Sequence, residues 1–287
     1  MKKLFYFLSL LIILVFFLAP QTYLFFIPRF EDFLNILKHE NTLKAAQNTL
    51  LVSSCVGLFC LTLGLPLSWV LTRTDLPLKS KLRSLFCLPY AIPPFVGAIG
   101  WIILANPTSG VLNQWFGLQL NIYSFWGLVW IETSFLFTFV LLSALTLLDK
   151  MDSSLEEAAR LSGASGFRVF FDIALPILKP AILSGFILSF LATAASFGVP
   201  ALIGGPARLY LLTTQIFTFQ RMGTEQGLQM SLALSALLGI GTLGLLYFTQ
   251  KFFGQSQNYT VGGKSSRPSL VPLKSWRIPL LLFLLVL

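Results

Sequence analysis

Long apolar stretches run through the chain, and their length constrains the fold more than any other feature. A helix needs about 20 predominantly apolar residues to cross the hydrocarbon core of a bilayer. Six stretches of that length are separated by charged segments or by segments rich in Pro and Gly: residues 4–27, 50–71, 84–105, 124–148, 181–203 and 228–250. We therefore expect an all-α polytopic membrane protein with six transmembrane helices.

The composition excludes a soluble protein. Apolar residues make up 55% of the chain and charged residues only 11%, whereas about 25% of the residues in a soluble domain are charged. Much of the outer surface must therefore be compatible with lipid. The net charge of +9 then reports membrane topology, and we expect no nucleic-acid partner. Cys55, Cys60 and Cys87 lie inside apolar stretches, so we expect inert packing for all three.

The distribution of Lys and Arg predicts the orientation. With the N-terminus in the cytoplasm, fifteen of the twenty Lys and Arg residues fall in inner segments and five in outer segments. Short cytoplasmic loops carry an excess of these residues, so we expect the N-terminus inside. The first stretch is interpreted as an anchor rather than a cleaved signal peptide, because it continues past Pro20 and no small-residue cleavage site follows.

The order of these segments predicts the domain organisation. Residues 1–250 are expected to form the transmembrane domain, and residues 251–277 a cytoplasmic linker. A new apolar run begins at Ile278 and comprises ten residues up to Leu287. Ten residues are too few to cross a bilayer. We interpret residues 278–287 as the start of a further, truncated transmembrane segment.

The loop between the fourth and fifth stretches, residues 149–180, is rich in helix formers. Ser153 with Glu156, or Ser154 with Glu157, has capping-box spacing, so a helix is expected there and on through Leu161. Gly163 supplies a bend. A second helix follows over residues 165–173, and Pro176 is expected to end it.

Two interpretations of this loop remain open from composition alone. It is either an interfacial amphipathic linker or a docking helix. In the second case the small side chains of Ala158 and Ala159 allow close approach by a partner, while Glu157 and Arg160 fix orientation at the rim.

The loop resembles the EAA signature of membrane subunits of bacterial binding-protein-dependent ABC importers. The matching residues are Glu157-Ala158-Ala159, then Gly163, then Ile173-Ala174-Leu175-Pro176. The resemblance implies the ABC importer permease (MetI-like) fold, with a cytoplasmic helix-turn-helix coupling loop between transmembrane helices 4 and 5. It also implies a set of residues for coupling to the ATPase: Glu157, Ala158, Ala159, Arg160, Gly163, Leu175 and Pro176.

Three further segments look like the ferric-iron-type branch of this family, whose members are often two six-helix halves in one polypeptide. They are Arg73-Thr74-Asp75-Leu76-Pro77, the proline-rich run 88–94, and 197–204 with 212–214. The linker and the run at Ile278 are similar to the junction between halves, and the second half is absent. The resemblance implies the bacterial inner membrane as location and four partners: a cytosolic ABC ATPase dimer, a periplasmic solute-binding protein, a second permease half, and the lipid bilayer.

We expect no catalytic site, bound cofactor or metal site in this chain. It has no phosphate-binding loop, no HExxH motif and one histidine, His39, expected to be solvated. The resemblance implies that ATP is used by the partner ATPase. Candidate pathway or gating residues are those that break helices, Pro93, Pro94, Gly198 and Pro200, and the intramembrane acid Glu132.

Each of these candidates has an alternative. The Pro and Gly residues are equally compatible with ordinary helix ends, and Glu132 with a hydrated position near Trp126 and Trp130. The resemblance implies a permease that couples ATP hydrolysis to uptake, with ferric iron as the expected substrate. Thiamine, a polyamine or a phosphonate is the alternative. An ion-coupled carrier fits less well, because it would need several intramembrane acids.

Overall fold

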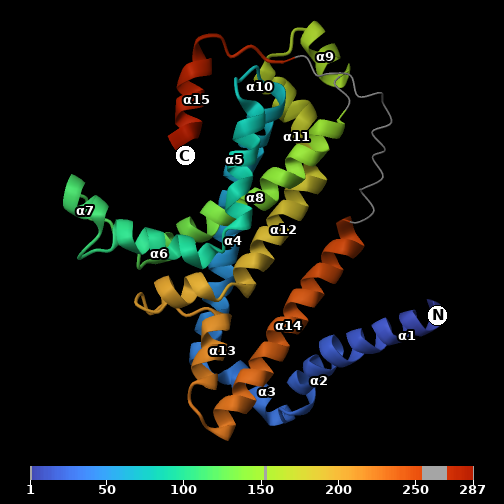
Figure 1. The fold of residues 1–287 in the computed structure, drawn as a ribbon, viewed down its shortest axis with the longest axis vertical. Coiled ribbons are helices and arrows are strands. Elements are labelled where there is room, and N and C mark those ends of the chain that lie inside the picture. The colour runs from blue at the N-terminus through green and yellow to red at the C-terminus, as the bar shows by residue number, and fades with distance from the viewer. Residues whose placement is uncertain (1, 152–153, 254–269, 287) are drawn as a thin grey trace.

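The computed structural model describes residues 2–151, 154–253 and 270–286, and most of these lie in helices. Three long helices form the centre (Figure 1): α4 (Glu40–Arg73), α8 (Phe125–Lys150) and α12 (Lys179–Ala195). The other helices are α1 (Lys2–Ile13), α2 (Ala19–Phe26), α3 (Phe30–Lys38), α5 (Lys79–Ala91), α6 (Pro94–Ala105), α7 (Val111–Phe116), α9 (Ser154–Leu161), α10 (Gly166–Arg168), α11 (Leu175–Ile177), α13 (Leu212–Gln220), α14 (Glu225–Phe253) and α15 (Arg277–Val286). Short π-helical segments occupy η1 (Leu14–Leu18), η2 (Val169–Ala174) and η3 (Pro200–Gly204), and η5 (Lys274–Trp276) is a 3₁₀ turn.

Glycines let the three central helices approach closely. A Cβ placed on Gly64 of α4 would lie 2.8 Å from Val140 Cβ of α8, and one on Gly185 of α12 would lie 2.9 Å from Val140 Cα. Val140 itself is completely buried. Small residues are the usual means of bringing helix backbones together in a membrane, where lipid removes the hydrophobic drive to associate.

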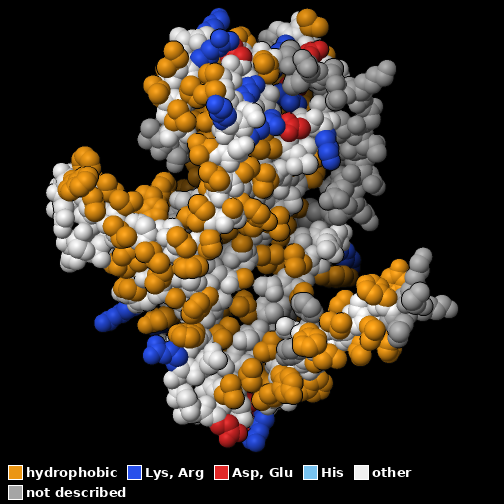
Figure 2. Space-filling view, in the orientation of Figure 1, with side chains coloured by type: hydrophobic (Ala, Val, Ile, Leu, Met, Phe, Trp, Pro, Cys, Tyr) orange, Lys and Arg blue, Asp and Glu red, His pale blue; other side chains and the backbone are white. Residues whose placement is uncertain are grey.

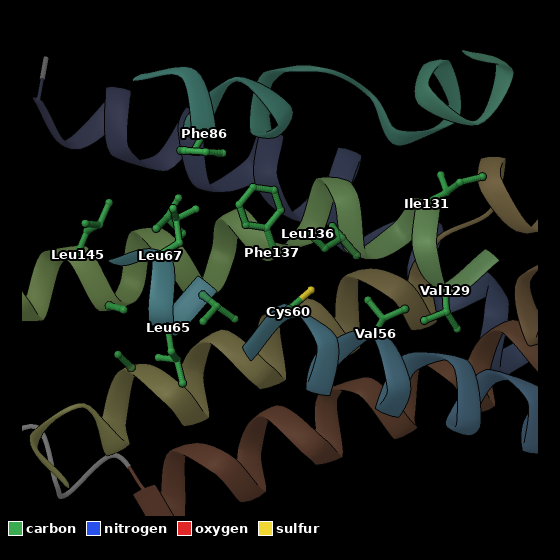
Figure 3. Packing of buried hydrophobic residues seen from close by; sticks show 14 of the residues in the cluster. Val56, Cys60, Leu65, Leu67, Phe86, Val129, Ile131, Leu136, Phe137 and Leu145 are labelled. Carbon is green, nitrogen blue, oxygen red and sulfur yellow. The ribbon is translucent and has the colours of Figure 1, made fainter. Parts of the chain in front are cut away.

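Apolar side chains fill the space around this contact (Figure 3). The labelled residues come from α4, α5 and α8 and lie between these helices, with Phe86 of α5 facing Phe137 of α8. The rings of Phe86 and Phe137 meet edge to face at a centroid distance of 6.5 Å. The core therefore runs along the bundle, and most of the large apolar side chains outside it are exposed, as a lipid-facing surface requires.

Four helical segments of the described residues are long and apolar enough to cross a membrane: Phe5–Phe26, Glu40–Arg73, Phe125–Lys150 and Glu225–Lys251. Two more candidates are bent pairs. Lys79–Ala91 and Pro94–Ala105 meet at 96°, and Gly166–Ile177 and Lys179–Ala195 meet at 69°. The expected number of six is reached when each bent pair is counted as one broken span.

The expected third span, residues 84–105, is broken at Ile92 and Pro93, within the proline-rich run where helix breaks were expected. Ile92 and Pro93 each precede a proline and both adopt extended backbone (ψ 125° and 128°). The proline ring clashes with an α-helical residue before it, which explains why α5 ends at Ala91. In Figure 1, α6 and α7 consequently project sideways from the bundle.

The expected fifth span, residues 181–203, also needs correction. Helix α12 starts at Lys179 and ends at Ala195, and Ser196 is extended with ψ 135°. The Ser196 carbonyl accepts a 2.6 Å hydrogen bond from Thr213 Oγ1, which replaces the helical partner lost at the break. The second span is longer than expected, because α4 begins at Glu40.

Charge is concentrated at one end of the bundle. Figure 2 shows most Lys and Arg side chains gathered around α9 and the neighbouring helix ends, while the middle of the visible face is largely apolar. We call this the loop end. Its cations lie at the ends of the apolar helices, the arrangement on which the expected orientation depends.

The last part of the expected linker, from Val271 to Arg277, folds back onto the loop end. Residues 254–269 of that linker lie outside the described residues, whereas α14 continues to Phe253. Val271 pairs with Thr74 in a short parallel bridge, and the Leu273 amide donates a 2.8 Å hydrogen bond to Asp75 Oδ1. Arg277 forms an ion pair with the Asp75 carboxylate, and these contacts lower the pKa of Asp75 to about 2. Asp75 is therefore ionised at neutral pH.

The glycine contacts at Val140 predict the effect of a single methyl group. Gly185→Ala should lower the free energy of unfolding by about 1–3 kcal/mol, because its Cβ meets backbone of α8 that cannot move aside. Thermal unfolding of the purified protein in detergent measures the change. Gly239→Ala is the matched control, since a Cβ on Gly239 meets nothing within 4 Å. It should leave stability unchanged or raise it by up to about 1 kcal/mol. Equal effects of the two substitutions would contradict the packing account.

Candidate functional site

Helix α9 lies at the loop end, beyond the ends of α4 and α8 (Figure 1). It covers Ser154–Leu161, with Glu156 and Glu157 in its first turn and Arg160 in its last. This charge order favours helix formation, because acids suit the positive N-terminus and bases the negative C-terminus. The expected helix is thus confirmed. Ser153 of the expected capping box lies outside the described residues.

A buried ion pair holds α9 against the end of α4. Arg73 Nε donates a 2.7 Å hydrogen bond to Glu156 Oε1, and the two side chains are only 2% and 1% exposed. Arg160 Nη2 lies 3.8 Å from the other carboxylate oxygen of Glu156. Glu156 and Arg160 are four residues apart and therefore share the inner face of α9. Both sequence neighbours of Glu156, Leu155 and Glu157, are more exposed.

Gly163 makes the expected bend. Its φ of +86° lies in the left-handed region, which a residue with a Cβ enters at a cost. The Gly163 amide donates to the Arg160 carbonyl (2.9 Å) and the Ala164 amide to the Ala159 carbonyl (3.0 Å). This pair of bonds is a Schellman motif, which satisfies the last carbonyls of α9 while the chain reverses.

The second helix of the loop returns to the bundle. Ser165 caps it, with its hydroxyl accepting from the Arg168 amide. Phe170 packs edge to face on Trp69 of α4 at a centroid distance of 5.1 Å. The helix ends one residue later than expected: it continues past Pro176 through Ile177, and the chain bends at Leu178.

The outer face of α9 is apolar and exposed. Leu155 is 55% and Leu161 90% exposed, and the small Ala158 lies exposed between them. We call these three residues the α9 face. A leucine at 90% exposure is unfavourable in water, so the α9 face has the character of a surface that contacts protein or lipid.

The other predicted coupling residues have mixed positions. Glu157 and Ala159 are half-buried on the flanks of α9, and Arg160 is turned toward Glu156. Leu175 packs against the core, and Pro176 is exposed at the start of α11.

The sequence interpretation did not identify Arg73 and Glu156 as a pair. The spacing of Glu156 and Arg160 was a usable signal that both lie on one face of α9. Nothing in the sequence showed that the last residue of α4, 83 positions earlier, would supply the buried partner.

The predicted gating residues meet at the two helix breaks. Pro93 and Pro94 lie at the bend between α5 and α6, and Gly198 lies at the break after α12. A Cβ on Gly198 would come within 2.8 Å of Phe95 Cβ on α6, so the two breaks are in contact. Pro200 is buried in the first turn of η3.

Glu132 is buried within α8, at 1% exposure. Trp126 and Trp130 are 63% and 48% exposed, so Glu132 does not share their outward position. Glu132 Oε1 has no hydrogen-bond partner among the described residues, and neither do the buried hydroxyls of Ser53 and Thr133. Within residues 2–151, 154–253 and 270–286, no group of three or more His, Cys, Asp and Glu residues could hold a metal ion.

Comparison with known proteins gives a family and several relatives. Residues 62–253 match the family described as "Binding-protein-dependent transport system inner membrane component", and this range includes the whole loop. The molybdenum transport system permease protein ModB of Escherichia coli K12 is 34% identical over 155 residues, covering 52% of this chain and 66% of ModB. The ferric transport system permease protein FbpB of Actinobacillus pleuropneumoniae is 26% identical over 284 residues, covering 93% of this chain and 40% of FbpB.

A solved structure shares the fold. The crystal structure of a bacterial alginate ABC transporter in complex with an alginate pentasaccharide-bound periplasmic protein has a chain that superposes with a TM-score of 0.71 at 17% identity. The match covers 90% of this chain and 95% of that one. By contrast, the chain spans just under two thirds of the length of ModB and two fifths of the length of FbpB.

The buried pair predicts a strong effect of removing one partner. Arg73→Met should lower the free energy of unfolding by about 3–5 kcal/mol, because it leaves the Glu156 carboxylate buried without its main partner. The double variant Arg73→Met with Glu156→Met should recover most of this loss. Thermal unfolding in detergent is the measurement. Lys44→Met, which removes an exposed pair with Glu40, is the control and should have no measurable effect. A double variant as unstable as Arg73→Met would refute this interpretation.

The bend at Gly163 predicts a local effect. Gly163→Val should destabilise the loop by about 1–2 kcal/mol, since a β-branched residue is forced into the left-handed region. Trypsin should then cleave faster after Arg160 and Arg168, as followed by mass spectrometry. Gly163→Asn is the control, because asparagine tolerates this conformation. Equal cleavage of the two variants would show that backbone conformation is not the cause.

Proposed function

Because the chain belongs to the family of binding-protein-dependent transport system inner membrane components, we propose that it is a permease subunit of an ABC importer. In this role it forms part of the translocation pathway and passes the force of ATP hydrolysis from a cytosolic ATPase to the membrane helices. The observation that carries the proposal is the construction of α9, which is fixed on one side by a buried ion pair and exposes apolar residues on the other.

The α9 face is the proposed contact with the ATPase. Leu155, Ala158 and Leu161 supply apolar contact area, and Ala158 allows the partner backbone to come close. Glu157 and Arg160 flank this face and would set the orientation. Ala159 and Gly163 would shape the helix and its bend, while Leu175 and Pro176 lead the chain back to the bundle.

The loop contacts the bundle directly, so a force on α9 would be transmitted to the central helices through few contacts. Arg73 attaches α9 directly to the end of α4, and Phe170 attaches the second helix to Trp69 of the same helix. At its two ends the loop continues into α8 and α12. When closure of an ATPase dimer moves α9, these three central helices should follow as a unit, since they are closely packed on Val140.

The contact between the helix breaks is the proposed hinge or gate. Backbone outside regular helix lies at or next to the predicted gating residues, at Ile92 and Pro93 on one side and at Ser196 and Phe197 on the other, within the chain's apolar segments. Glu132 is the proposed polar group of the pathway, because an acid buried within a membrane helix is costly unless it has a role.

The proposed partners follow from the family. They are a cytosolic ATPase dimer that uses ATP, a periplasmic solute-binding protein that captures the substrate, and a second permease half. The chain itself is proposed to hold no cofactor and to catalyse no reaction. The excess of cations at the loop end supports placing α9 and the N-terminus on the cytoplasmic side of the inner membrane.

Ferric iron is the proposed substrate. The similarity to FbpB extends over 93% of this chain, whereas the similarity to ModB covers 52% of it. Uptake of radioactive ferric iron and of radioactive molybdate by cells expressing the complete transporter separates the two. Iron uptake without molybdate uptake is expected, and the reverse would assign the chain to the molybdate relatives.

The α9 face predicts a selective loss of ATPase binding. Leu161→Glu should abolish copurification of the ATPase, because a charge replaces the most exposed apolar side chain of the α9 face. Leu78→Glu makes the same chemical change on an exposed residue at the same end of the bundle, outside α9, and should leave copurification intact. Normal ATPase recovery with Leu161→Glu would remove the docking proposal.

A further inference from the structure

A second feature of the loop end is a cavity of about 560 Å³ beside the start of the loop. It lies where α4 and α8 end and α5 begins, and its polar wall consists of Thr72, Arg73, Lys79, Ser80, Arg83 and Asp149. None of these residues belongs to the α9 face, so the cavity is separate from the proposed ATPase contact.

Positive charge exceeds negative charge around the cavity. Three cations line it, Arg73, Lys79 and Arg83, against the single carboxylate of Asp149. Arg83 donates two 3.0 Å hydrogen bonds to the Asp149 carboxylate, and Arg73 donates one to Glu156. Lys79 forms no ion pair within the described part of the chain. The cavity therefore keeps one cation that has no ion-pair partner, although the Asp75 carboxylate acts on it from a greater distance.

The Arg73 guanidinium has hydrogen-bonding capacity to spare. Its side chain is 2% exposed, and only its Nε is bonded to Glu156. Its Nη2 is buried with no hydrogen-bond partner among the described residues. Glu156 Oε2 is likewise buried without a hydrogen-bond partner, so the existing pair leaves this donor unsatisfied. Leaving a charged donor buried and unpaired costs free energy, which favours a further acceptor at this point.

The start of α5 supplies a third attraction for an anion. This 13-residue helix begins at Lys79 with no capping hydrogen bond from the side chain of Leu78, and its first turn contains no acid. The unpaired N–H groups of its first turn and the positive end of its dipole favour a negative group at this position.

From these observations we propose that the cavity is a binding site for a phosphate-class anion, held by Lys79, the first-turn amides of α5 and the Arg73 guanidinium. Phosphate matches this set because it accepts several hydrogen bonds at once from cations and amides. The same chemistry is offered by inorganic phosphate and by the headgroup of an anionic phospholipid, which basic pockets between membrane helices recognise.

The occupied site would strengthen the base of the loop. The anion would join the end of α4 to the start of α5. It would bind Arg73, whose Nε already bonds Glu156 of α9. Coupling between the loop and the helices would then depend on phosphate or on the surrounding lipid, independently of which solute the permease carries.

Binding of two probes to the whole protein in detergent tests the proposal. Inorganic phosphate is titrated in one arm and dioctanoylphosphatidylglycerol in the other, with dioctanoylglycerol as the matched lipid that lacks phosphate. Thermal unfolding reports saturable binding. Lys79→Gln should weaken binding about tenfold, the equivalent of one charge-assisted hydrogen bond. Lys81→Gln removes the same charge from the same helix turn outside the cavity and should change it less than about twofold.

The outcomes distinguish a free phosphate from a lipid headgroup as the ligand, or they refute the binding site. Saturable binding of inorganic phosphate that is sensitive to Lys79→Gln supports a free anion as ligand. Binding of the phospholipid alone, with the same sensitivity, supports a lipid headgroup. No saturable binding of either probe, equal binding of dioctanoylglycerol, or equal losses in the two lysine variants would overturn the proposal.

Discussion

The ion pair between Arg73 and Glu156 is the contact on which the organisation of the loop end depends. Two charges have been taken out of water, and each is tolerated there only because the other is within hydrogen-bonding distance. A buried pair of this kind adds little to the stability of the fold, but it fixes the position of α9 relative to α4. Helix α9 has eight residues, too few for an isolated helix to persist in water, so its place is set by this anchor and by the motif at Gly163. The inner face of α9 is fixed in this way, and the outer face is left free to bind.

The same end of the molecule combines three kinds of attachment that differ in strength and in their sensitivity to conditions. The pair with Glu156 is shielded from salt, because both groups are buried. The Arg83–Asp149 fork and the Asp75–Arg277 pair are partly open to solvent and therefore weaken as ionic strength rises. The contact of Phe170 with Trp69 does not depend on charge at all. The loop is thus secured to α4 by the two contacts that salt affects least.

The sequence predicted the class of fold, the loop and its bend, because each depends on local signals. Apolar length identified the spans, and Gly163 marked a position that only a residue without a Cβ occupies freely. The errors lie where a neighbour decides the outcome. The break at Ser196 depends on the hydroxyl of Thr213, which is distant in sequence. Arg73 could be recognised as charged, but its partner could not, since that pairing exists only once α4 and α9 are side by side.

The contacts between Asp75 and the segment around Leu273 join residues 198 positions apart in the sequence. Chains are made from the N-terminus, and contacts between distant residues form late because the loop between them must first be closed. Asp75 therefore reaches its final environment only after α8, α12 and α14 have been synthesised. Until then the end of α4 lacks its bridge to Val271 and its ion pair with Arg277. Formation of these contacts thus requires that all six apolar segments have already been made.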